Sequence, residues 1–266
     1  MPAARRLLVA LGPLAVLAAC ASTAGTNGAV PIDDTRPADG SPATAAVTAP
    51  DSGATGDTTG AVAPSDPVAQ AVEDVLGGQA AISRPVGDDG RAPEITDDRV
   101  FILGDSIIES AGPTHYDTIR RELAPLGWEA ILDAHSGRTT PEGLAALSRR
   151  GRDVHDVVVV LLGHNDAIDP TAYRERVETL VSGLRDVPLV LLLTNYEFER
   201  GRDRMNDQLR VVGALHDNVE LVDWNAVARA TDGAIGPDGL HLTRTGARAL
   251  AATIAMSLGV APAAAT

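Results

Sequence analysis

The sequence predicts an α/β domain in which a parallel sheet lies between two layers of helices. From Arg99 onward, short apolar runs alternate with amphipathic stretches. The apolar runs are almost uninterrupted, which is typical of parallel strands that are buried on both faces. The composition is 44% hydrophobic but only 3% aromatic, so the core must consist mainly of Val, Leu, Ile and Ala.

Five apolar runs have the length and composition of buried strands. They lie at residues 100–103, 128–134, 157–162, 189–194 and 219–222. Because helical stretches separate the runs, the sequence predicts a three-layer α/β/α domain with a five-stranded parallel sheet of flavodoxin-like strand order. In that architecture, functional residues gather beyond the carboxyl ends of the strands.

The stretches between and after these runs have the periodicity of amphipathic helices. We expect helices at residues 114–126, 140–150, 169–185, 202–216 and 243–258. Thr140, which is followed by Pro141, is the expected cap of the second helix, and Thr243 is the expected cap of the last.

The first 20 residues predict an export signal with a site for lipid attachment. Arg5 and Arg6 precede an apolar run at residues 7–17, which is too short to span a bilayer as a mature helix. The segment from Leu17 to Cys20 resembles the bacterial lipobox, in which the cysteine is lipidated and becomes the new N-terminus. We therefore expect Cys20 to anchor the protein to the outer face of a bacterial cell membrane. The alternative is an ordinary secretory signal that contains a cysteine.

Residues 21–93 predict a disordered tether, because a segment rich in Ala, Thr, Gly, Pro, Ser and Asp cannot bury enough apolar surface to offset chain entropy. Residues 68–82 are an exception with apolar residues near helical spacing, and they predict a short helix or a docking segment. The folded domain is expected at residues 94–260, followed by a disordered tail at residues 261–266.

The charged and sulfur-containing residues exclude several kinds of chemistry. The formal net charge of −14 disfavours nucleic acid as a partner, because phosphate binding needs clustered basic residues. The chain has no lysine, which excludes Ser-Lys dyads and Schiff bases. Cys20 is the single cysteine, so the sequence predicts neither an intrachain disulfide nor a cysteine-rich zinc site. No metal or organic cofactor is expected.

Four polar stretches lie where the predicted architecture would bring them to one edge of the sheet. Gly104-Asp105-Ser106, Ser136-Gly137-Arg138 and Gly163-His164-Asn165-Asp166 follow the first three strands, and Asp238-Gly239-Leu240-His241 precedes the last helix. Such stretches are also ordinary turn and capping sequences, so each one alone is at least as compatible with a structural role.

Together these stretches contain the residue types that a serine nucleophile requires. His241 could remove the proton of Ser106, and Asp238 could fix the tautomer of that imidazole. The backbone N–H groups of Ser106 and Gly137 and the side-chain amide of Asn165 could stabilise an oxyanion. Their convergence in space is the test of this hypothesis.

The four stretches resemble the conserved blocks of the SGNH, or GDSL, hydrolases, in the order of that family, over residues 99–258. The resemblance implies the roles given above for the serine, histidine, aspartate, glycine and asparagine, without a cofactor. Ser136-Gly137-Arg138 and Asp223-Trp224-Asn225 are also similar to SGNH domains found beside membrane O-acyltransferases of bacterial cell walls.

Four further residues are weaker candidates for substrate contacts. Arg138 could meet an anionic substrate or be a solvated charge, and His164 could contact substrate or merely be exposed. Tyr196 and Phe198 could line an acyl or sugar pocket, or they could pack a long loop over the sheet edge.

These observations predict an exported, lipid-anchored serine esterase that cleaves a short acyl ester from a carbohydrate such as a cell-wall polysaccharide. Acetyl is the expected acyl group. The alternatives are an O-acetyltransferase that uses the same site, with a membrane acyltransferase as partner, and a catalytically silent binding lipoprotein. A phosphate-binding domain of flavodoxin type is disfavoured, because no Gly-rich nucleotide loop follows a strand.

Overall fold

The computed structural model describes residues 66–77, 94–151 and 154–263, which all belong to one compact unit, Thr59–Thr266. Its five strands form one parallel sheet in the order β2-β1-β3-β4-β5. The strands are β1 (Arg99–Gly104), β2 (Glu129–Ala134), β3 (Val157–Leu161), β4 (Leu189–Leu193) and β5 (Val219–Val222). The predicted α/β class, parallel sheet and flavodoxin-like order are confirmed.

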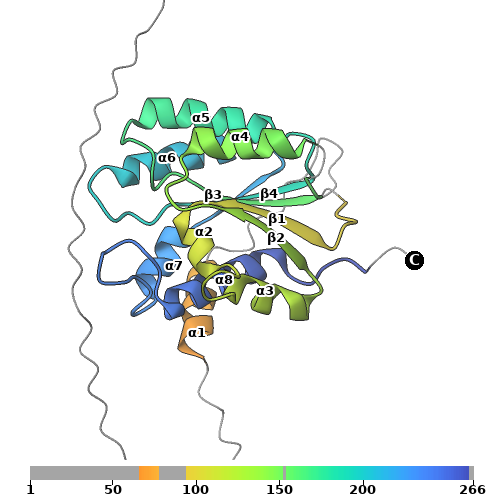
Figure 1. Cartoon of the computed structure of the whole chain (residues 1–266), viewed down its shortest axis with the longest axis vertical. Helices are drawn as coiled ribbons and strands as arrows, with labels where there is room; N and C mark the ends of the chain where they lie inside the picture. Colours follow the sequence, from red (N-terminus) through yellow and green to blue (C-terminus); the bar gives the residue numbers. More distant parts are fainter. Residues whose placement is uncertain (1–65, 78–93, 152–153, 264–266) are drawn as a thin grey trace, which may run out of the picture. The chain divides into compact units, whose positions relative to one another are not determined.

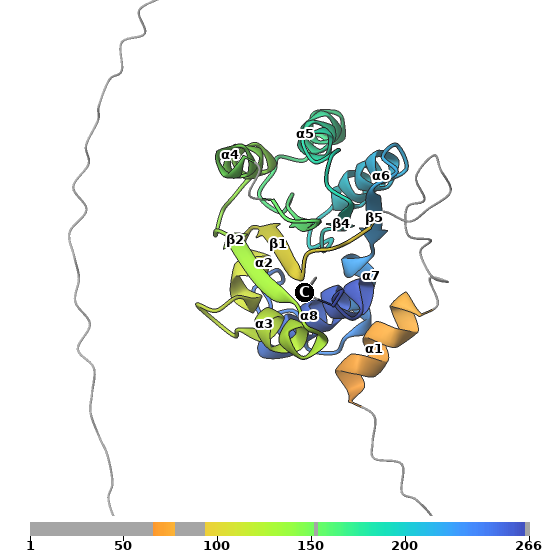
Figure 2. The same cartoon turned by 90° about the vertical axis from the view of Figure 1, so that its right-hand side faces the viewer.

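Helices cover both faces of the sheet (Figures 1 and 2). One face is covered by α4 (Thr140–Arg150), α5 (Pro170–Ser182) and α6 (Arg202–Gly213). The other face carries α1 (Pro67–Leu76), α2 (Ser106–Ala111), α3 (Thr118–Leu123), the 3₁₀ helix η1 (Ala124–Leu126), α7 (Trp224–Ala230) and α8 (Arg244–Leu258). The domain therefore has the predicted three layers.

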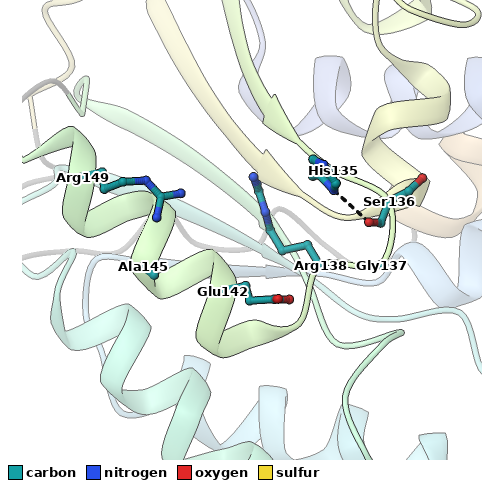
Figure 3. A pocket seen from close by; sticks show the side chains of 7 residues that line it. All are labelled: His135, Ser136, Gly137, Arg138, Glu142, Ala145 and Arg149. Atoms are coloured by element: carbon teal, nitrogen blue, oxygen red, sulfur yellow. Dashed lines mark hydrogen bonds between the residues drawn. The ribbon is translucent and has the colours of Figure 1, made fainter. Parts of the chain in front are cut away.

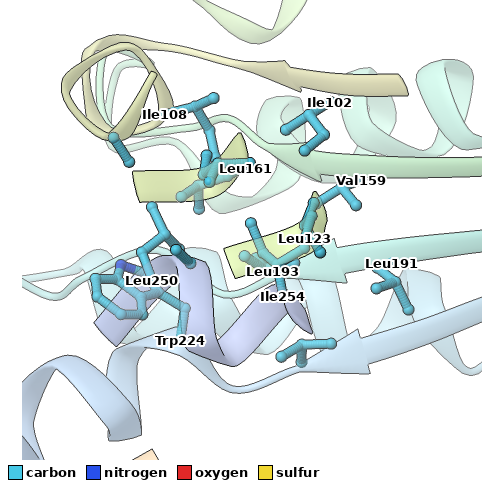
Figure 4. Close-up of a cluster of buried hydrophobic side chains, with 14 of the residues drawn as sticks. Ile102, Ile108, Leu123, Val159, Leu161, Leu191, Leu193, Trp224, Leu250 and Ile254 are labelled. Carbon is cyan, nitrogen blue, oxygen red and sulfur yellow. The ribbon is translucent and has the colours of Figure 1, made fainter. Parts of the chain in front are cut away.

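Each face of the sheet has its own apolar core. In β1, Val100 and Ile102 enter the core beneath α8, which Figure 4 shows in part, whereas Phe101 and Leu103 enter the core beneath α4 and α5. Because side chains alternate between faces, a strand that is covered on both sides needs an apolar residue at every position. This explains the uninterrupted apolar runs in the sequence.

The helix expected at residues 114–126 begins later, and this part of the prediction is wrong. The Gly112 carbonyl accepts hydrogen bonds from the N–H groups of His115 and Asp117, which forms a turn before α3. Asp117 has φ +51°, a left-handed conformation that a helix interior does not contain. The helix therefore starts only at Thr118.

The cap of α4 also differs from the prediction. Thr139, not Thr140, is the N-cap, and it forms a capping box with Glu142. Thr140 is instead buried, and both its backbone N–H and its hydroxyl donate to Asp166 Oδ2. Helices α2 and α7 were not predicted as separate elements, and both are short.

Helix α1 is an ordered exception inside the predicted tether, at the segment for which a helix was one alternative. Val68 and Val72 are buried in the core that includes residues of α7 and α8. Asp66 caps the helix and also pairs with Arg248 of α8. The remaining parts of the tether prediction, residues 21–65 and 78–93, lie outside the described residues.

The structure describes the two ends of the chain only in part, so the predictions for these ends are only partly tested. The signal segment with Cys20 and residues 264–266 lie outside the described residues. The predicted tail is not free at its start, because the Ala261 N–H donates to the Leu126 carbonyl. Within the described ranges, no helix combines the length and the hydropathy that crossing a bilayer requires.

Candidate active site

The carboxyl ends of the strands carry the loops that contain the predicted site residues other than Asp238 and His241, which lie between α7 and α8. Ser106 opens α2 immediately after β1, and residues 135–139 connect β2 to α4. Residues 162–169 follow β3, and residues 194–201 follow β4. Because all strands are parallel, these connections begin at the same edge of the sheet.

The structure brings Ser106, His241 and Asp238 into one hydrogen-bonded chain. His241 Nε2 lies 3.1 Å from Ser106 Oγ, although the two residues are 135 positions apart. His241 Nδ1 lies 2.7 Å from Asp238 Oδ2. A carboxylate at Nδ1 holds the proton on that nitrogen, so the Nε2 lone pair faces the serine hydroxyl. The imidazole is therefore placed to accept the proton of Ser106.

The loop before α8 positions the carboxylate through local hydrogen bonds. Asp238 Oδ1 accepts the backbone N–H groups of Leu240, at 3.1 Å, and His241, at 3.0 Å. The hydrogen bond from the His241 side chain and these backbone N–H groups lower the pKa of Asp238 to about 2. Asp238 is therefore ionised whenever the imidazole needs a partner.

The three predicted oxyanion donors also come from loops that touch. The N–H groups of Ser106 and Gly137 donate to no acceptor within the described part of the chain. Gly137 has φ +79° and faces open space, as a residue must if its N–H is to approach a ligand. The Asn165 amide donates to the Arg138 carbonyl at 3.1 Å, which holds Asn165 against the loop that carries Gly137.

Glycine is required where the loop after β3 begins. Gly163 has φ +134°, and a Cβ atom there would lie 2.4 Å from the Tyr173 hydroxyl and 2.5 Å from Asn195 Nδ2. These two groups are themselves hydrogen-bonded and buried. The close approach fixes the path of the backbone toward Asn165.

Arg202 and Asp166 hold the same loop from two sides. Arg202, which is 4% exposed, donates from Nη1 to the carbonyls of Gly163, at 2.7 Å, and Asp166, at 2.9 Å. The Asp166 carboxylate accepts two hydrogen bonds from Thr140 and one from Arg176. Asp166 therefore orients the loop that carries Asn165, and the role of Arg202 in holding this loop was not predicted.

His164 is neither exposed nor free to contact a substrate, so both alternatives predicted for it are wrong. It is 4% exposed, and its Nε2 accepts the Tyr196 N–H at 3.1 Å. Its Nδ1 therefore carries the proton and donates to Asp105 Oδ2 at 3.0 Å. His164 joins the loops after β1, β3 and β4.

Arg138 is not a solvated charge, as one alternative had it. Its guanidinium group donates to Asp133 Oδ1 at 2.6 Å and to the carbonyls of Asp133 and Gly104. Tyr196 and Phe198 are partly buried, with the guanidinium groups of Arg229 and Arg202 over their respective rings. These contacts favour the packing alternative for both aromatic residues.

The sequence contained little signal for two supporting residues. Glu109 Oε2 accepts the Ser136 hydroxyl at 2.6 Å, which joins α2 to the loop that carries Gly137. Its position one helical turn after Ser106 was the available signal. Arg202 had none, because its carbonyl partners lie 36 and 39 residues away. Among the described residues, no group of three or more His, Cys, Asp or Glu side chains could hold a metal ion.

Comparisons with known proteins agree with this geometry. The sequence profile of the GDSL-like lipase/acylhydrolase family matches residues 102–249. The chain is 25% identical over 171 residues to YrhL of Bacillus subtilis (strain 168), which is described as a proposed peptidoglycan O-acetyltransferase. That match covers 63% of this chain but only 25% of the length of YrhL.

Two solved structures have similar folds. The C-terminal catalytic domain of peptidoglycan O-acetyltransferase A (OatA) from Streptococcus pneumoniae has a TM-score of 0.51 and 22% identity, over 62% of this chain and 94% of that domain. A family 3 carbohydrate esterase from Clostridium thermocellum has a TM-score of 0.50 and 18% identity, over 59% and 93% of the two chains. At these identities, the similarities establish the fold.

The lowered pKa of Asp238 makes a prediction about pH. Since that pKa is about 2, the carboxylate keeps its charge as pH falls until that value is reached. We expect log kcat/KM for a small acetyl ester to fall on the acid side with a slope no greater than one above pH 4, because Asp238 gains no proton there. A slope of two above pH 4 would contradict this.

Replacement of Asp238 tests its role as the partner of the imidazole. We expect Asp238→Asn to lower kcat by about 10⁴-fold at the pH optimum, because the amide no longer holds the imidazole in the required tautomer. Initial rates with the small acetyl ester give this measurement.

Arg202 should affect turnover through Asn165. We expect Arg202→Lys to lower kcat about tenfold with less effect on KM, because a shorter ammonium group cannot reach the two carbonyls and also keep the Nε and Nη2 contacts with Glu199. The loop that carries Asn165 then shifts. In a double-mutant cycle with Asn165→Ala, we compare the loss of transition-state stabilisation in the double variant with the sum of the losses in the two single variants. These two values should differ by about 1 kcal/mol. Arg210→Lys, a surface position on the same helix, is the matched control. Additive effects would show that Arg202 acts only on stability, which thermal unfolding would report.

Proposed function

The chain belongs to the GDSL-like lipase/acylhydrolase family, and we propose that it is a serine esterase that removes a short acyl group, such as acetyl, from a carbohydrate. The predicted family and its class of enzyme, the ester hydrolases, are thereby confirmed. The observation that carries the proposal is the 3.1 Å contact between His241 Nε2 and Ser106 Oγ, with Asp238 at the other imidazole nitrogen.

The proposed reaction has two halves. Ser106 Oγ attacks the ester carbonyl while His241 Nε2 takes its proton, and the resulting oxyanion accepts hydrogen bonds from the Ser106, Gly137 and Asn165 donors. The intermediate collapses to an acyl-serine as His241 protonates the departing sugar oxygen. Water then loses a proton to His241 and attacks the acyl group, which releases the carboxylic acid and regenerates Ser106.

Two observations support a carbohydrate as the alcohol part of the ester. The similar proteins include peptidoglycan O-acetyltransferase A and a family 3 carbohydrate esterase, and YrhL is described as a proposed peptidoglycan O-acetyltransferase. A pocket beside Gly137 is lined by polar and charged residues, with Ala145 as its one apolar side chain. Such a lining suits hydroxyl groups better than it suits a long acyl chain.

An O-acetyltransferase is the second candidate, favoured by the match to YrhL. The acyl-serine would be the same, but a sugar hydroxyl would replace water as the acceptor. A membrane acyltransferase would be the partner that supplies acyl groups. A catalytically silent binding protein is the third candidate, and it would need none of the hydrogen-bonded geometry at Ser106.

Replacement of the nucleophile tests the mechanism. We expect Ser106→Ala to abolish turnover of 4-nitrophenyl acetate, a loss of at least about 10³-fold, because no other group can carry the acyl intermediate. A fluorophosphonate probe should label Ser106 in the wild type and nothing in the variant. A matched control is Ser110→Ala on the same helix, whose hydroxyl bonds only the Ile107 carbonyl.

The alternatives give different products. The esterase should release acetate from O-acetylated cell-wall polysaccharide, whereas a transferase should move acetyl groups to added oligosaccharide. If the protein neither releases acetate nor reacts with the probe, the result supports the catalytically silent binding protein. Retained activity in Ser106→Ala would refute the serine mechanism.

We further propose that the protein is exported and held at the outer face of the cell membrane by a lipid on Cys20. The support is the lipobox-like sequence Leu17-Ala18-Ala19-Cys20 after a short apolar segment. Mass spectrometry of the mature protein should find an acylated N-terminal cysteine, and Cys20→Ala should move the protein from the membrane fraction to the medium. An unmodified N-terminus downstream of Cys20 would identify an ordinary secretory signal instead.

A further inference from the structure

A polar pocket lies beside the loop that follows β2. Its volume is about 330 Å³, and Figure 3 shows its lining. The lining residues are His135, Ser136, Gly137, Arg138, Glu142, Ala145 and Arg149. Gly137 belongs to both this pocket and the proposed oxyanion site, so a molecule in the pocket lies next to the reacting ester.

Most polar groups in this pocket already have partners. The Arg138 guanidinium bonds the carboxylate of Asp133, and the Glu142 carboxylate accepts the backbone N–H and hydroxyl of Thr139. The N–H and hydroxyl of Thr139 hold the pKa of Glu142 below its usual value, so this carboxylate remains the ionised half of the capping box.

Arg149 is the exception. Within the described ranges, Arg149 takes part in no ion pair and no hydrogen bond, and the residue is exposed. It extends from the last turn of α4 toward the guanidinium group of Arg138 (Figure 3). Asp133 neutralises the charge of Arg138, whereas Arg149 has no such partner in the described part of the chain. A carboxylate on a ligand can therefore pair with Arg149, because the planar guanidinium group binds both carboxylate oxygens.

His135 adds a hydrogen-bond acceptor. Its Nδ1 lies 2.9 Å from the Ser136 carbonyl, which can only accept, so Nδ1 carries the proton. In the neutral ring, Nε2 is then left as an acceptor for a hydroxyl group. The pocket therefore offers a cation for a carboxylate and an acceptor for a hydroxyl within one site, a combination that matches an acidic sugar.

We propose that this pocket binds the carbohydrate part of the ester and that Arg149 recognises a carboxylate on it. The inference rests on the proposed function, because the ligand is the alcohol part of the same substrate. A chain with a net charge of −14 repels acidic polymers at long range. An unpaired cation in the pocket that Gly137 also lines would offset that repulsion where the carbohydrate binds.

Arg149→Gln tests the proposal with paired substrates. O-acetylated glucuronoxylan oligosaccharides carry the carboxylate on the sugar ring, and O-acetylated peptidoglycan oligosaccharides carry it on substituents. Each is compared with the same material after its carboxylates have been converted to methylamides. We expect the wild type to prefer at least one acidic form in kcat/KM, and Arg149→Gln to lower that preference about fivefold, through KM.

The matched control is Arg120→Gln. Arg120 is exposed near Trp128 and Glu129, at the other end of β2 from Gly137, so the preference should not change. The wild-type preference should also fall when NaCl is raised from about 50 to 500 mM, because salt screens an exposed ion pair. The Arg149→Gln variant should show little salt dependence.

Binding of the deacetylated acidic oligosaccharides, measured by calorimetry, separates this proposal from the catalytic one. Weaker binding in Arg149→Gln than in the wild type supports the pocket even if no ester is turned over. Equal binding, or an acid preference that is equal in the wild type and Arg149→Gln, overturns it while leaving the Ser106 mechanism intact.

Discussion

The arrangement of the site depends on the buried carboxylate of Asp105. Burying a charge is costly unless hydrogen bonds replace its water, and here both oxygens are occupied. Oδ1 accepts the Ile107 N–H and so caps the helix that Ser106 opens, while Oδ2 accepts the Nδ1 proton of His164. His164 in turn accepts the Tyr196 N–H. One side chain thus links the nucleophile's turn to the loops after β3 and β4.

The other loops are joined in the same manner, by polar side chains that reach from one strand end to the next. Arg138 bonds the last residue of β1, and Asn165 bonds the backbone of Arg138. Glu109 reaches the same loop from α2. Backbone N–H donors stabilise an oxyanion best when they are fixed before the reaction, and this bonding fixes them without any contribution from the substrate.

The sheet and the reacting groups could be predicted from the sequence because both have local signatures. Uninterrupted apolar runs identify strands buried on both faces, and Asp238 lies three residues from His241. The burial of His164 and the role of Arg202 could not be predicted, since their partners come from other strands. The start of α3 was predicted too early, because the spacing of apolar residues does not reveal that Asp117 has a left-handed backbone conformation.

The exposure of the triad is the argument for proposing hydrolysis before acyl transfer. The side chains of His241 and Asp238 are 50% and 53% exposed, whereas Ser106 is only 7% exposed. The base therefore stands at the rim of the site, where water reaches an acyl-serine freely. A transferase must keep water from that intermediate until a sugar hydroxyl arrives. In the described residues, nothing covers the imidazole, so transfer would require the acceptor or a partner protein to exclude water.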